Sequence, residues 1–92
     1  MRTEFSPTIG NVLQIAELLR RKVNANTSSR VRNLDIKIEY KDGDTKIFLR
    51  GLSDTYYVKL LAQQPFRDLE SELPGILGIN HFPEINNEIE VR

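Results

Sequence analysis

The residue types that could carry out chemistry in this chain are few, and they centre on a single histidine. The chain has no cysteine, so a metal ion could use His81 only together with carboxylates such as Glu84. Ser53, Asp54 and His81 supply the residue types of a nucleophile, an acid and a base. No nucleophile-elbow pattern surrounds Ser53, and its place before a helical segment predicts a helix N-cap instead. We therefore expect no catalytic residue, no metal site and no cofactor, and we expect His81 to be an exposed residue of a loop over 80–87.

Two short glycine-containing strings have the form of ligand loops. Asp42-Gly43-Asp44 carries two carboxylates, but an EF-type calcium loop needs a longer series of oxygen ligands that ends in glutamate. A tight hairpin turn explains this string without a ligand. Gly75-Ile76-Leu77-Gly78 has the GxxG form of KH-type RNA-binding domains, which makes a KH-like domain the alternative prediction. Against it, the proline-containing segment that follows cannot begin a long helix.

The charge balance bears on possible partners. Thirteen Lys and Arg residues stand against thirteen Asp and Glu residues, so the formal net charge is zero. A chain without a basic surplus lacks the electrostatic attraction that drives binding to phosphate backbones. Composition therefore weighs against a nucleic-acid partner.

Length and hydropathy bound the architecture and the compartment. A chain of 92 residues can bury one modest core, so we expect residues 1–92 to form a single domain. No apolar run approaches the roughly 18 residues of a membrane span. Glu4 and Pro7 stand where a signal peptide needs a continuous apolar run. We expect a cytoplasmic protein, or a periplasmic one if a leader has been removed.

Hydrophobic periodicity predicts a helix followed by a β-hairpin. Apolar residues recur at steps of three and four over 7–24, after a flexible N-terminus at 1–6. The period changes to two from Leu34, and the Asp42-Gly43 turn separates two alternating segments, which predicts a hairpin over 34–52. Gly43 would supply the turn, and Gly51 would reverse the chain as it leaves the second strand.

The rest of the chain predicts a second helix and a last strand. Helical spacing continues over 54–73, where Pro65 predicts either a kink or a break into two short helices, and the continuous apolar stripe favours a kink. Gly75 beyond it predicts a left-handed helix stop. Clean alternation over 88–92 predicts the last strand. The fold class is therefore α+β: a two-layer α-β-β-α-β sandwich with a three-stranded sheet and both helices on one face. Either hairpin strand could neighbour the last strand, and a mixed sheet is preferred.

Several of these motifs resemble the BON domain family. The resemblance covers roughly 34–91. It rests on the hairpin with Ile47-Phe48-Leu49-Arg50-Gly51, on Leu73-Pro74-Gly75-Ile76 followed by Ile79, and on Asn87-Glu88-Ile89-Glu90-Val91. It implies an attachment module that binds phospholipid or membrane surfaces, and it brings no catalytic residues. The second helix with Pro65 and the segment His81-Phe82-Pro83-Glu84-Ile85-Asn86 depart from the family pattern.

The candidate partner-binding residues are apolar residues on faces that should be exposed to solvent. On a helical projection, Tyr56 and Leu60 fall opposite the buried stripe, on the same side as Arg67. Phe48 lies alone on the charged face of the hairpin. Tyrosine, leucine and arginine together have the composition of an interface hot spot. We expect a non-enzymatic interaction or attachment module whose partner is a protein or a membrane surface, and whose oligomeric state the sequence leaves open.

Overall fold

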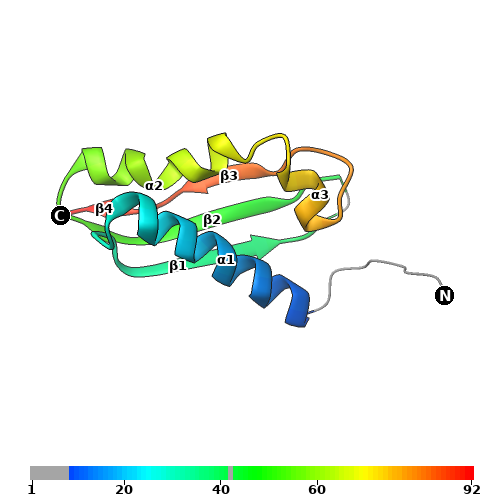
Figure 1. Cartoon of the computed structure of the whole chain (residues 1–92), viewed down its shortest axis with the longest axis horizontal. Helices are drawn as coiled ribbons and strands as arrows, with labels where there is room; N and C mark the ends of the chain where they lie inside the picture. The colour runs from blue at the N-terminus through cyan, green and yellow to red at the C-terminus, as the bar shows by residue number, and fades with distance from the viewer. Residues whose placement is uncertain (1–8, 42) are drawn as a thin grey trace.

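The computed structural model describes residues 9–41 and 43–92 (Figure 1). The elements, in chain order, are α1 (Ile9–Thr27), β1 (Arg32–Glu39), β2 (Lys46–Ser53), α2 (Tyr56–Asp68), α3 (Leu73–Leu77), β3 (Glu84–Asn87) and β4 (Glu90–Val91). The helices pack against a single sheet. The predicted α+β class is therefore confirmed.

β2 lies in the middle of a mixed sheet. β1 pairs with it antiparallel, so that Ile36 faces Leu49 and Ile38 faces Ile47. β3 and β4 follow one another along the other side of β2, and both run parallel to it. The preference for a mixed sheet is confirmed, and the last strand lies beside the second hairpin strand.

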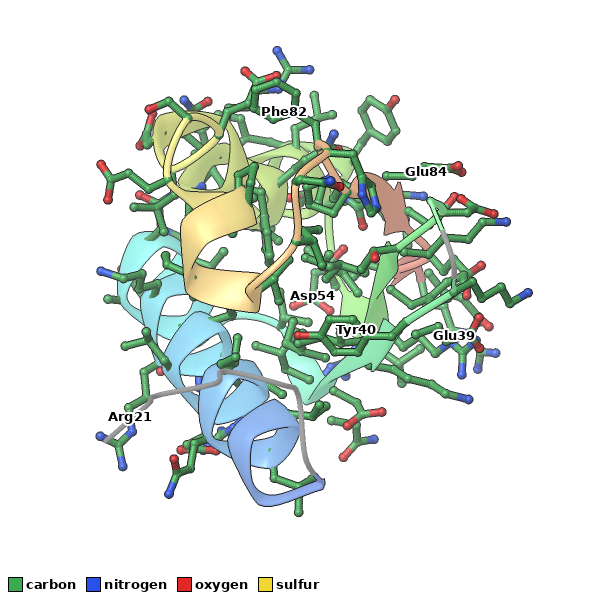
Figure 2. The ribbon with its side chains drawn as sticks, turned by 90° about the vertical axis from the view of Figure 1, so that its right-hand side faces the viewer. Arg21, Glu39, Tyr40, Asp54, Phe82 and Glu84 are labelled. Carbon is green, nitrogen blue, oxygen red and sulfur yellow. The ribbon has the colours of Figure 1, made fainter. Side chains whose placement is uncertain are left out.

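The helices cover one face of this sheet, and the other face is open to solvent (Figure 2). Alternation along the strands decides which side chains are buried, because successive residues point to opposite faces. Lys37 on the outer face is exposed, whereas its neighbours Ile36 and Ile38 are buried. The buried apolar core consists of Leu19, Val23, Val31, Ile36, Ile38, Ile47, Leu49, Val58, Ala62, Phe66, Leu73, Leu77 and Ile89.

α1 ends at Thr27, later than the predicted end at residue 24. Two contacts made by polar residues hold the extra turn. The Thr27 side chain is buried and donates a hydrogen bond to the Val23 carbonyl at 2.8 Å, and Asn26 donates to the Leu61 carbonyl of α2 at 2.8 Å. Ser28, with φ of 55°, then ends the helix. The predicted Pro7 start lies outside the described residues.

The segment predicted as one kinked helix over 54–73 forms two helices. α2 runs through Pro65 and ends at Asp68, and α3 begins after a turn, with Pro74 in its first turn. The N-cap of α2 is Thr55, whose hydroxyl accepts a hydrogen bond from the Val58 N–H at 3.1 Å. The predicted cap, Ser53, is instead the last residue of β2, where the strand ladder holds its backbone extended.

Gly51 and Gly75 have other roles than those predicted. Gly51 lies inside β2 and reverses no chain, because pairing with β4 carries the strand on to Ser53. Gly75 lies within α3, and the left-handed cap is Gly78, with φ of 72°. Gly43 has φ of 68°, and the hydrogen bond from Asp44 N–H to the Lys41 carbonyl at 3.0 Å closes the turn around it.

The predicted strand over 88–92 is also corrected, because pairing with β2 begins earlier. Ile85 faces Ile47 in the parallel ladder of β3, within a segment whose asparagines and proline predicted a loop. β4 retains only Glu90 and Val91 of the predicted strand. Between β3 and β4, Ile89 is buried in the core.

Candidate functional site

The outward face of α2 brings together three of the sequence-predicted site residues. Tyr56 and Leu60 are 62% and 49% exposed, and Arg67 is also exposed. They stand four and then seven residues apart, so they follow one side of the helix. Tyr57 is 64% exposed and was missed, although it lies near Leu60 on the same helical projection. We name Tyr56, Tyr57, Leu60 and Arg67 the α2 surface.

A cleft of about 400 Å³ adjoins the C-terminal half of this surface. Arg67 lines both, so the two features are continuous. The residues that line the cleft are Gln63, Phe66, Arg67, Glu70, Leu73, Phe82, Pro83 and Ile85. Phe66 and Leu73 are buried, and Phe82 is 64% exposed. We name this feature the Phe82 cleft.

Phe82 is the functional candidate that the sequence reasoning missed. It stands between His81 and Pro83, in a segment whose turn-forming residues predict a loop. An aromatic residue that belongs to no amphipathic stripe has no predicted core partner, and that signal could have marked it. Figure 2 shows Phe82 at the outer end of the helical layer, far from the open sheet face.

The polar groups around the cleft fall into two kinds. Asn87 of β3 donates hydrogen bonds to the Lys59 carbonyl at 2.8 Å and to the Gln63 side-chain oxygen at 3.4 Å, which holds α2 against β3. The side chains of Arg67 and Glu70 make no ion pair within residues 9–41 and 43–92. Asn87 therefore fixes the position of Gln63 in one wall of the cleft. Arg67 and Glu70 have no ion-pair partner among the described residues.

Phe48, the fourth predicted residue, lies apart from the α2 surface. It is on the outer face of β2, where it pairs with Lys37 and Asn86 on the neighbouring strands. Its ring is half-buried, and the Arg50 guanidinium lies 5.2 Å from the ring centroid. This cation–π contact and the flanking side chains account for Phe48 on a charged face.

The potential catalytic residues do not assemble. The Ser53 side chain is buried and donates a hydrogen bond to the Thr55 carbonyl at 3.0 Å, while Asp54 pairs with Arg32 at 3.1 Å. His81 lies at the other end of β2, where its Nε2 accepts a hydrogen bond from the Thr45 N–H at 3.3 Å. His81 is half-buried rather than the exposed loop residue expected, because this contact holds it against the strand.

Two further features limit what the surface can bind. Across the part of the chain that the structure describes, no three side chains of metal-ligating type lie close enough to hold an ion. The GxxG string lies in α3 and its cap, whereas the joint between α2 and α3 at 69–72 contains no glycine. The string therefore does not form a loop between two helices.

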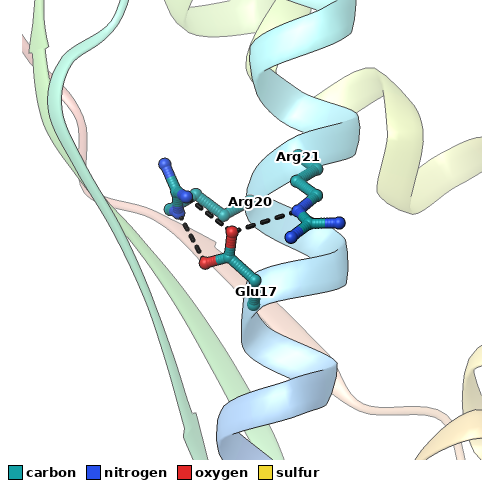
Figure 3. A network of polar contacts seen from close by, with 3 residues as sticks. All are labelled: Glu17, Arg20 and Arg21. Atoms are coloured by element: carbon teal, nitrogen blue, oxygen red, sulfur yellow. Dashed lines mark hydrogen bonds and ion pairs between the residues drawn. The ribbon is translucent and has the colours of Figure 1, made fainter.

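Two adjacent arginines of α1 pair with the same carboxylate (Figure 3). Glu17 accepts hydrogen bonds from Arg20 at 2.6 and 3.0 Å and from Arg21 at 3.1 Å. The hydrogen bond from Arg20, then that from Arg21, holds the pKa of the Glu17 carboxyl below its usual value. The hydrogen bond that Arg20 donates to Glu17 in turn raises the pKa of Arg20. These two arginines therefore share one carboxylate within one helix.

Comparisons with known proteins leave the family open. No family model, no curated protein and no solved structure matches the chain. The resemblance to the BON family therefore stays a prediction. Among the described residues, no helix has both the length and the apolar character needed to cross a membrane.

Proposed function

We propose that this chain is a non-enzymatic interaction domain that binds a protein partner through the α2 surface and the Phe82 cleft. The observation that carries the proposal is the exposure of Tyr56, Tyr57 and Leu60 along α2 and of Phe82 at a cleft that Arg67 also lines. Aromatic residues and arginine dominate the binding energy of protein interfaces when they enter desolvated pockets. A cleft beside an exposed helix face suits the insertion of one apolar side chain from a partner.

A protein partner fits this region better than a phospholipid surface. Within the part of the chain that the structure describes, Arg67 is the one cation that lines the Phe82 cleft, and Glu70 lines it as well. Binding to anionic membranes gains about 1 kcal/mol for each basic residue near the surface, so a region with balanced charge gains little. A protein partner can instead supply one complementary charge to each group.

The same reasoning disfavours the other two functions. An enzyme would need a nucleophile and a base in reach of each other, whereas Ser53 and His81 take structural hydrogen bonds at opposite ends of β2. A KH-like domain would need a GxxG loop between two helices, and here Gly75 lies inside α3. The first observation weighs against an enzyme and the second against RNA binding, so both support a domain that binds another protein.

The test is capture of a specific partner from extract of the source cells by the immobilised chain. We expect the Tyr56→Ala plus Leu60→Ala variant to lose the partner, and Phe82→Ala to weaken its capture at least tenfold, because truncation removes contact area without opening a core cavity. Leu18→Ala is the matched control, since Leu18 is an exposed apolar residue of α1. Thermal melts check that every variant folds.

Two further probes separate the competing partners. Vesicles of phosphatidylcholine with phosphatidylserine test the membrane, and single-stranded RNA tests a KH-like function. Binding to either probe that is lost in the Tyr56→Ala plus Leu60→Ala variant would contradict a protein partner. Equal capture by the wild type, the Tyr56→Ala plus Leu60→Ala variant and the Phe82→Ala variant would remove the α2 surface and the Phe82 cleft from consideration.

A further inference from the structure

Across residues 9–41 and 43–92, the outer edge of β1 pairs with no other strand. β1 spans Arg32–Glu39, and within the described residues it pairs only with β2. Its other edge therefore presents backbone N–H and C=O groups that no neighbouring strand satisfies. Natural proteins blunt such edges with proline, bulges, short strands or charged side chains, lysine above all, and β1 carries a lysine at Lys37. β1 contains no proline, and its one irregularity lies near its start, between Arg32 and Asp35.

Charge alternates along the exposed face of this edge strand. Asp35 is negative, Lys37 is positive and Glu39 is negative, while Ile36 and Ile38 between them point to the core. An antiparallel neighbour with the same sequence can therefore place opposite charges face to face. Which residues meet depends on the register, because side chains that face each other must lie on the same side of the sheet.

The register centred on Ile36 pairs opposite charges and keeps most of β1 in the ladder, whereas a register centred on Ile38, which sets Lys37 opposite Glu39, keeps only residues 37–39 of β1 in it. When Ile36 faces Ile36 of a second copy, each Asp35 faces a Lys37, and Leu34 faces Ile38 on the helical side. A shift by two residues in one direction places Lys37 opposite Lys37, and a shift in the other direction places Asp35 opposite Asp35. Like charges directly opposite each other destabilise a strand pair. The strand is thus complementary to itself about Ile36.

We propose that two copies of this chain associate through their β1 edges in this register, as an antiparallel pair that continues the sheet across both copies. The α2 surface is left open, because α2 packs over β2, β3 and β4 while α1 packs over β1. The dimer is therefore independent of the proposed partner surface, and either can fail without the other.

The first test measures association by sedimentation equilibrium over roughly 10 µM to 1 mM of the full chain. The wild type is expected to dimerise, and Lys37→Glu is expected to weaken dimerisation about tenfold or more, because it sets like charges opposite each other twice. The double variant Asp35→Lys plus Lys37→Glu restores the opposite pairs and is expected to dimerise again. Lys22→Glu on α1 changes the net charge equally and should associate like the wild type. Circular dichroism confirms folding.

A second test reads the register directly, since the chain has no cysteine of its own. Asp35→Cys and Lys37→Cys chains are mixed, oxidised and separated by mass. A disulfide needs Cα atoms within about 7 Å, so only the mixed dimer should cross-link, and each variant alone should not. A monomeric wild type, dimerisation of Lys37→Glu equal to the wild type, or a mixture that fails to cross-link would overturn the proposal.

Discussion

Replacing Gly51 with alanine should destabilise the fold more than any other single-methyl change among its glycines whose surroundings are described. Asp35 pairs with Arg50 and Arg32 pairs with Leu52, so the two residues between Arg32 and Asp35 face Gly51 alone. This arrangement is a β-bulge, and it brings the two backbones close together. A Cβ at Gly51 would lie 2.7 Å from Val31 Cγ1 and 2.9 Å from the Arg32 carbonyl oxygen.

Two costs add up at this position. Gly51 has φ of 156°, which side chains of L-residues rarely adopt, and such strain costs about 1–3 kcal/mol. Overpacking against a backbone oxygen that cannot retreat costs about 1–3 kcal/mol more. The sum of about 2–6 kcal/mol compares with a total stability of roughly 5–14 kcal/mol for a chain of this length. We therefore expect Gly51→Ala to lose a large part of the free energy of unfolding.

Urea denaturation followed by circular dichroism measures this loss. With a slope of about 1–3 kcal/mol per molar urea, the midpoint of Gly51→Ala should fall by about 0.7 M or more. Gly75→Ala is the matched control, because a Cβ there meets no atom within 4 Å and Gly75 is helical. It should raise stability by about 0.5–1 kcal/mol through the better helix propensity of alanine. If the Gly51→Ala midpoint equalled that of the wild type, the close approach described here would be wrong.

Two further predictions concern the helices. Thr55→Ala should lower the free energy of unfolding by about 0.5–2 kcal/mol in urea melts, because it removes the side-chain cap of α2, and an unchanged midpoint would contradict the cap. The folded state holds the pKa of Glu17 below the ordinary value of 4.5, so its ion pairs with Arg20 and Arg21 contribute stability above that pH. That contribution is lost as the pH falls through the folded pKa. Melts of the wild type and Glu17→Gln should therefore differ near neutral pH and converge in acid, and a gap that persists in acid would refute this account.

The elements whose own residues alternate were predictable from the sequence. Ile36, Ile38, Ile47 and Leu49 repeat at a period of two, and all four are buried on one face of the hairpin. The pattern suffices because the pleat alone determines which face each residue takes.

The candidate site was predictable in part, for a similar reason. The helical period places Tyr56, Leu60 and Arg67 on the outward side of α2, and all three are exposed. The same period does not describe Phe82, which reaches the cleft from the segment before β3. Its position depends on where the chain runs after α3, and local spacing carries no information about that path.

Only the tertiary structure decided where the elements end and which strands are neighbours. Asn26 extends α1 by bonding to α2, and Ile85 joins a strand because β2 offers a parallel ladder beside it. Both depend on backbone groups supplied by residues distant in the sequence, and a buried backbone group must find such a partner. The sequence by itself determined the α+β class and the faces of the hairpin and α2, because these follow from periodicity within each segment. The strand order and the cleft arose only when segments far apart in the chain satisfied one another's hydrogen bonds and apolar surface.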